Sequence, residues 1–219
     1  MRRKENSILS NIKNLVLENI IKYFKEYTIV TICFVIGVIV GVIFINNLAD
    51  NQSNEIGVYI NSFLETLHSD VNFNYLELLK NSLIQNFLLV LALWFVGATL
   101  IGIPIVFAII LFRGFCLGYT ISAIIHILGI SKGVLFVVTT MFLHNLLFIP
   151  AIIALAVSGI RLYQTVVKNR NAESIKFALL KHSIFALIIM LILVLSSIIE
   201  VFISTNLFSL ICNFLVTAE

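Results

Sequence analysis

The sequence is poor in charged residues and in proline. Of its 219 residues only 11% are charged, 60% are hydrophobic, and Pro104 and Pro150 are its two prolines. Soluble domains carry charge on about a quarter of their residues. A water-soluble fold of this length could not cover so much apolar surface, whereas lipid can act as its solvent. No proline-rich or serine-rich linker divides the chain. The composition therefore predicts one integral membrane domain, an all-α polytopic helix bundle.

Reactive motifs are also missing from the sequence. The three cysteines, Cys33, Cys116 and Cys212, have a spacing that fits neither a zinc site nor a disulfide framework. No P-loop or H-E-x-x-H pattern occurs. We therefore expect no catalytic residues, no cofactor and no metal site. The excess of positive charge is explained by membrane topology, so no nucleic-acid partner is expected.

The abundant apolar residues fall in runs long enough to cross a bilayer. About twenty residues at ~1.5 Å per residue span the ~30 Å hydrocarbon core. The central block 82–160 holds 79 residues with two formal charges, Arg113 and Lys132. The flanking charges, described next, put the two ends of this block on opposite sides of the membrane, so the number of crossings must be odd. One crossing of that length is too long and five are too many, so three are expected there. The full prediction is five spans, at about 28–48, 82–104, 105–130, 134–160 and 182–203.

Basic residues predict the orientation of these spans. Residues 1–27 carry six Lys or Arg and 161–181 carry five, whereas 49–81 carries one and is acidic. Basic short segments stay in the cytoplasm. We therefore expect the leader 1–27 and the inner loop 161–181 inside the cell. The segment 49–81 and the tail 204–219 are then extracytoplasmic.

Three segments outside the spans show helical patterning. The leader 1–27 predicts an amphipathic helix, which lies either on the inner membrane face or against the rest of the protein. In 49–81 an apolar stripe indicates an outer-loop helix. Asn74 with Glu77 three residues later is typical of a helix N-terminus, so a helix is expected to begin near Tyr75. The tail 204–219 predicts an interfacial helix.

The border between the second and third spans is open to two interpretations. One places Arg113 in an inner turn between helices. The other breaks the chain at Gly102-Ile103-Pro104 and leaves Arg113 inside the membrane. We favour an inner re-entry between Gly102 and Gly114. The run of residues 129–133, which contains Lys132, predicts an outer turn.

Several polar residues within the spans are candidates for helix packing or partner contact. His126 is interpreted as a packing residue, with a proton relay as the alternative. His144 and Asn145 are adjacent in the fourth span and need partners in hydrocarbon. They either bond neighbouring helices or contact a partner. Pro150 removes one helix hydrogen bond and should kink its span.

Two pairs of glycines are spaced for close helix contact. Gly37 and Gly41 lie four residues apart in the first span, and Gly114 and Gly118 lie four apart after Arg113. A G-x-x-x-G spacing puts both glycines on one helix face, where another helix can approach closely. We interpret the second pair as a packing seam.

Two local motifs and the overall layout resemble the stage II sporulation protein M family. The motifs are R-G-F-C-L-G-Y at 113–119 and L-H-N-L-L-F-I-P-A at 143–151. The layout is a basic amphipathic leader, five spans and an acidic first outer loop. In the wider family the second motif has Pro-His-Gly and a later glutamate. This sequence has Leu143, Asn145 and Phe148 at those positions, which weakens any role assigned to that glutamate.

The resemblance implies a role in endospore engulfment at the sporulation septum. The chain would be a non-enzymatic membrane scaffold that recruits and anchors peptidoglycan hydrolases. The implied partners are sporulation protein D, a lytic transglycosylase, and sporulation protein P, an amidase, together with membrane lipid. The alternative is a transporter or channel component, which would need Arg113, His126 and His144 to line one water-filled path.

Overall fold

The computed structural model describes residues 20–47, 56–58, 75–99, 102–168 and 172–204, and among them every labelled element is a helix. Five helices are long and apolar enough to cross a membrane. They are α2 (Phe24–Asn46), α4 (Tyr75–Gly97), α5 (Gly102–Leu128), α7 (Phe142–Lys168) and α8 (Ala172–Ile198). The last continues into a π-helix, η1 (Ile199–Ser204). The predicted all-α bundle with five spans is confirmed.

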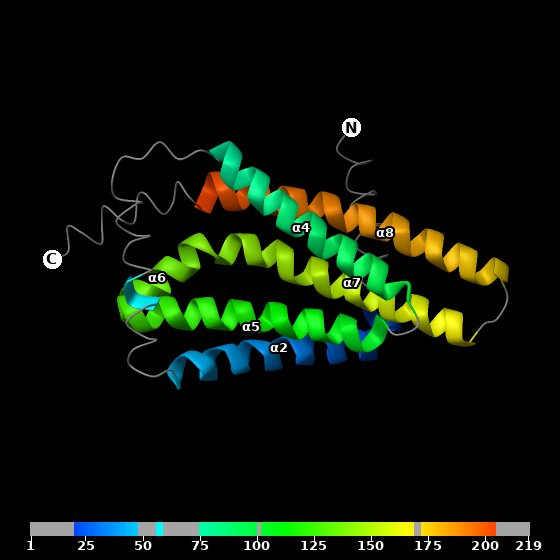
Figure 1. Ribbon diagram of the computed structural model, residues 1–219, viewed down its shortest axis with the longest axis horizontal. Coiled ribbons are helices and arrows are strands. Elements are labelled where there is room, and N and C mark those ends of the chain that lie inside the picture. Colours follow the sequence, from blue (N-terminus) through cyan, green and yellow to red (C-terminus); the bar gives the residue numbers. More distant parts are fainter. Residues whose placement is uncertain (1–19, 48–55, 59–74, 100–101, 169–171, 205–219) are drawn as a thin grey trace, which may run out of the picture.

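The long helices lie side by side in an elongated antiparallel bundle (Figure 1). At one end α2, α5 and α8 begin and α4 and α7 end. We call it the basic end, because it carries Lys22, Lys25, Arg161, Lys176 and Lys181. At the opposite end α4 and α7 begin, and η1 follows α8. Since α2 begins at one end and η1 lies at the other, the described chain crosses the bundle an odd number of times.

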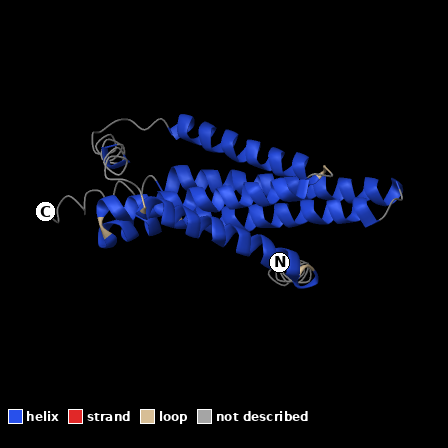
Figure 2. Cartoon of the chain, turned by 60° about the horizontal axis from the view of Figure 1, so that its bottom comes forward, coloured by secondary structure: helices blue, strands red, loops and turns tan. Residues whose placement is uncertain are grey.

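Helix α7 occupies the centre of the bundle. In its apolar window 56% of the residues are buried, against 33% or less in the other four long helices. It contacts α2, α4, α5, α6 and α8. The other helices keep large aliphatic side chains such as Ile39 and Leu191 on the outside. An apolar exterior around an apolar core suits a solvent of lipid. Figure 2 shows the same helices from another side.

The border between α4 and α5 differs from the expected re-entry. Helix α4 ends at Gly97, and α5 begins at Gly102 and runs without interruption through Arg113. Pro104 is the third residue of α5, so it belongs to the first turn, where its missing N–H costs no helix hydrogen bond. The glycine-proline segment therefore starts a helix rather than ending one. The inner-turn interpretation of Arg113 is wrong, because the residue lies in a helix interior.

The chain between α5 and α7 also differs in detail. Gly129, with φ of 77°, makes the turn after α5, and a short helix α6 (Ile130–Thr140) follows it. The chain breaks again at Met141 before α7 begins. One expected helix over 134–160 is thus two helices. The loop expected over 161–181 is mostly helical, because α7 ends at Lys168 and α8 begins at Ala172.

Helix α4 begins at Tyr75, as the sequence predicts. The helices predicted in 1–27, in most of 49–81 and in 204–219 fall largely outside the described residues.

Candidate functional site

A cluster of polar side chains joins α4, α7, α8 and η1 near the end opposite the basic end. We call it the polar network and define it as Ser82, Asn86, His144, Ser196, Ser197 and Glu200. Asn86, Ser196 and Ser197 are buried, and both serines have no exposed surface. In hydrocarbon such groups must find protein partners, so the sequence positions of these residues dictate which helix faces meet.

His144 connects α7 to α8. Its Nδ1 lies 2.8 Å from Ser196 Oγ and 3.2 Å from the Ser196 carbonyl oxygen. Ser196 Oγ also lies 3.1 Å from the His144 carbonyl oxygen, to which it donates. These contacts are satisfied together when Nδ1 carries a hydrogen and the serine hydroxyl donates to the carbonyl. The Glu200 carboxylate, 3.6 Å from the same Nδ1, favours that assignment.

Two residues of α4 complete the polar network. The Ser82 hydroxyl donates to the Glu200 carboxylate at 2.6 Å and lies 3.0 Å from the Ser197 hydroxyl. Asn86 Nδ2 donates to Ser197 Oγ at 2.8 Å. Ser197 in turn donates to the Leu193 carbonyl at 3.1 Å. Three helices and η1 are therefore held in one rotational register by side-chain hydrogen bonds.

Arg113 reaches this region from α5. Its guanidinium carbon lies 5.3 Å from the centre of the Phe148 ring, a cation–π arrangement. The other partner of Phe148 is the His144 ring, stacked with a centroid distance of 5.2 Å. Arg113 also interacts electrostatically with Glu200. A mid-helix arginine is thus placed against an aromatic face instead of lipid.

The remaining candidates do not join the polar network. Asn145 Nδ2 donates a hydrogen bond to the carbonyl of Met141 at 2.9 Å. Met141 lies between α6 and α7, so Asn145 bonds the backbone at the break before its own helix. Pro150 is exposed on the surface of α7. His126 is exposed near the end of α5, in a groove shared with Asn46 of α2. Of the three residues that a common water-filled path would need, His126 lies apart from Arg113 and His144.

Gly114 and Gly118 lie in a backbone-to-backbone contact with α2. A Cβ on Gly114 would overlap the Phe34 carbonyl oxygen, and one on Gly118 would overlap that of Val38. From the other side, Gly37 and Gly41 meet the backbone of α5 in the same way. We call these four residues the glycine seam. The two G-x-x-x-G pairs pack on each other, which brings the helix axes close.

Sequence reasoning missed a second polar contact nearer the basic end. His182 is buried, and its Nδ1 lies 2.9 Å from the Ser158 hydroxyl of α7. Trp94 Nε1 donates to Ser183 Oγ at 3.0 Å. Reasoning from sequence also left out Asn86, Ser196 and Ser197. Their signal was a polar residue on an otherwise apolar helix face, with Ser82 and Asn86 one turn apart.

The polar network does not have the geometry of a hydrolytic triad. A Ser–His–acid relay uses the two different ring nitrogens of the histidine. Here Ser196 and Glu200 both approach His144 Nδ1. Within the described residues no group of three His, Cys, Asp or Glu could hold a metal ion. The arrangement orients helices by hydrogen bonding.

The family described as stage II sporulation protein M matches residues 30–205, which include most of α2 and every later labelled helix. No curated protein and no solved structure matches the chain.

Proposed function

We propose a function from the premise that this multi-pass membrane chain belongs to the stage II sporulation protein M family. The proposed function is that of a non-enzymatic scaffold for endospore engulfment. It recruits peptidoglycan hydrolases and anchors them at the sporulation septum. The proposed partners are sporulation protein D, a lytic transglycosylase, and sporulation protein P, an amidase.

The polar network is the observation that carries this proposal. Its polar side chains form hydrogen bonds with one another across the helix interfaces, and these bonds connect α4, α7 and α8 to η1. A hydrogen-bonded cluster in low dielectric rigidifies the elements that it joins. The end of the bundle that it stabilises is where the chain leaves α2, enters α4 and leaves η1. A rigid end of this kind suits a docking platform for other proteins.

The proposed orientation puts that end outside the cytoplasm. Basic segments remain on the cytoplasmic side, so the basic end faces the cytoplasm and the opposite end faces the peptidoglycan. We expect a reporter fused after Glu219 to be active only outside the cytoplasm. A fusion active only in the cytoplasm would reverse the orientation and remove the proposed docking end from its partners.

Affinity capture from sporulating cells tests the scaffold. The chain is tagged at its N-terminus and purified in mild detergent, beside an unrelated polytopic protein with the same tag. We expect both hydrolases with the chain and neither with the control. The variant His144→Ala, which breaks the contact with Ser196, should lower their recovery, whereas His126→Ala should not. Recovery of neither hydrolase would contradict the proposal.

A second measurement tests the non-enzymatic part. The purified chain is incubated alone with isolated peptidoglycan, and released fragments are measured. We expect none above buffer. Fragment release that follows the protein through purification would contradict the proposal.

A further inference from the structure

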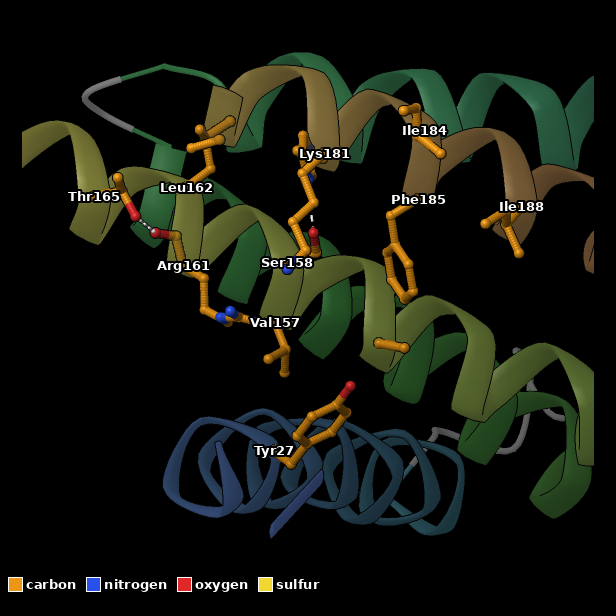
Figure 3. Close-up of a pocket in the computed structure, with 13 residues that line it drawn as sticks. Tyr27, Val157, Ser158, Arg161, Leu162, Thr165, Lys181, Ile184, Phe185 and Ile188 are labelled. Carbon is orange, nitrogen blue, oxygen red and sulfur yellow. Dashed lines mark hydrogen bonds between the residues drawn. The ribbon is translucent and has the colours of Figure 1, made fainter. Parts of the chain in front are cut away.

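A pocket between α2, α7 and α8 lies near the basic end (Figure 3). The polar network lies near the opposite end of the bundle. Its volume is about 280 Å³. Residues of all three helices line it, and most are apolar. The polar lining residues are Tyr27, Ser158, Arg161, Thr165, Lys181 and His182.

Two cations enter this pocket from different helices. Arg161 of α7 and Lys181 of α8 both line it, and no acidic residue is among the lining residues. Neither cation forms a salt bridge with a carboxylate within the described part of the chain. Glu26 of α2 attracts Arg161 electrostatically but lies outside the lining. The pocket therefore carries a net positive charge.

Some polar groups of the pocket already have a partner within the protein, and others can still bind a ligand. Ser158 bonds His182, and Thr165 bonds the Arg161 carbonyl at 3.0 Å. The Arg161 guanidinium is fixed over the Tyr23 ring, 3.2 Å from its centre. The Tyr27 hydroxyl points toward the pocket in Figure 3 and has no hydrogen-bond partner among the described residues. A held guanidinium, an ammonium and a phenol can together bind a phosphate.

Charged and apolar lining residues follow an order along the helices. On α7, Arg161 lies nearer the basic end than Val157 and Ala154. On α8, Lys181 lies nearer that end than Phe185 and Ile188. The two cations thus lie toward the membrane surface, beside Leu162 and Ala178, and the lining nearest the membrane centre is apolar. Tyr23 and Tyr27 lie at the cationic level, where aromatic residues typically meet the headgroup region.

From this order we propose that the pocket binds one anionic phosphoglycerolipid. Arg161, Lys181 and the Tyr27 hydroxyl hold the headgroup phosphate. An acyl chain lies against Ile184, Phe185 and Ile188. Basic pockets between membrane helices are a known way to retain anionic lipids. The site does not depend on the recruitment of hydrolases.

Native mass spectrometry of the whole protein tests the site. The protein is reconstituted in nanodiscs of equimolar phosphatidylglycerol and phosphatidylcholine, and the lipids that stay bound are counted. We expect enrichment of phosphatidylglycerol. The double variant Arg161→Gln/Lys181→Gln should reduce that enrichment about thirtyfold, since each of the two basic residues near the surface contributes roughly one kcal/mol.

A matched control removes the same charge outside the pocket. Lys25 and Lys176 are exposed at the same end and do not line the pocket. The double variant Lys25→Gln/Lys176→Gln should keep the wild-type enrichment. Equal losses in the two double variants would assign the effect to diffuse surface charge and overturn the proposal, as would no loss in either.

A labelling experiment on the wild-type chain needs no variant. A photoreactive phosphatidylglycerol should label peptides from 154–165 and 178–188. Unlabelled phosphatidylglycerol should compete, and phosphatidylcholine should not. Displacement by inorganic phosphate alone would make the site one for a soluble anion and overturn the lipid assignment. Labels confined to other helices would overturn it as well.

Discussion

The contact between α2 and α5 and the contact among α4, α7 and α8 achieve helix association in opposite ways. In the glycine seam the backbones meet directly, and the side-chain hydrogen bond between the two helices is that of Cys33 Sγ to the Phe107 carbonyl at 3.5 Å. In the polar network the helices are joined by hydroxyl, amide, imidazole and carboxylate groups. The glycine seam depends on the lack of side-chain atoms at four positions, whereas the polar network depends on polar side chains that bond one another.

This difference predicts different responses to substitution. Added volume in the glycine seam has nowhere to go, because the neighbouring atoms belong to a helix backbone that cannot rotate away. In the polar network a lost side chain leaves partners that keep other hydrogen bonds, as Ser197 keeps its bond to the Leu193 carbonyl of α8. Steric substitutions in the seam should therefore cost more than deletions in the polar network.

The largest effect is expected from Gly118→Leu. The new side chain would overlap the backbone of Val38, so α2 must separate from α5. We expect a loss of about 3 kcal/mol in the free energy of unfolding, measured by thermal denaturation in detergent. Ala108→Leu, on the exposed surface of α5, is the matched control and should change little. Equal stability of the two variants would contradict the seam.

The next effect is expected from Asn86→Leu in the polar network. The variant removes the amide that bonds Ser197 and should lower stability by about 1.5 kcal/mol. Asn81→Leu is the control, because Asn81 is exposed on the same helix. If Asn86→Leu destabilises more than Gly118→Leu, the ranking of the two contacts is wrong.

Arg113→Lys separates charge from planar stacking. The lysine keeps the positive charge near Glu200 but loses the flat guanidinium over Phe148. We expect a loss of about 1 kcal/mol. The same denaturation assay on Phe148→Leu should give a similar loss, and the double variant should lose less than the sum. Strict additivity would show that the ring and the cation do not interact.

The smallest effect is expected in a double-mutant cycle between His144→Ala and Ser196→Ala. Interhelical hydrogen bonds in membranes average about 0.6 kcal/mol. The coupling energy of this pair should be of that order, since several hydrogen bonds together hold α7 against α8. His126→Ala combined with Ser196→Ala is the control and should show no coupling. A zero value for both pairs would remove His144 from the polar network.

The composition and the hydrophobic runs were sufficient for the fold class and for the number of spans, because lipid imposes length and apolarity on each crossing. The spacing of Gly114 and Gly118 was sufficient to predict a packing seam. Its partner was not predictable from spacing alone. Which glycine pair faces which helix depends on the rotation of both helices about their axes.

The helix borders needed the tertiary structure. The preferred re-entry between Gly102 and Gly114 treated glycine and proline as breakers, whereas Pro104 lies in the first turn of α5. Arg113 could then stay in a helix interior because the ring of Phe148, distant in sequence, lies against its guanidinium. Local pattern does not reveal a partner that another helix provides.

The sequence by itself thus determined that this chain is an all-α membrane protein with five apolar helices. A helix that crosses lipid needs a long apolar run, and such runs can be read directly from the sequence. Only the tertiary structure decided that Asn86 meets Ser197, that His144 meets Ser196, and that the cations Arg161 and Lys181 share one pocket. Each of these contacts joins residues on different helices. The relative rotation and depth of packed helices is set by all contacts together, so no single stretch of sequence encodes it.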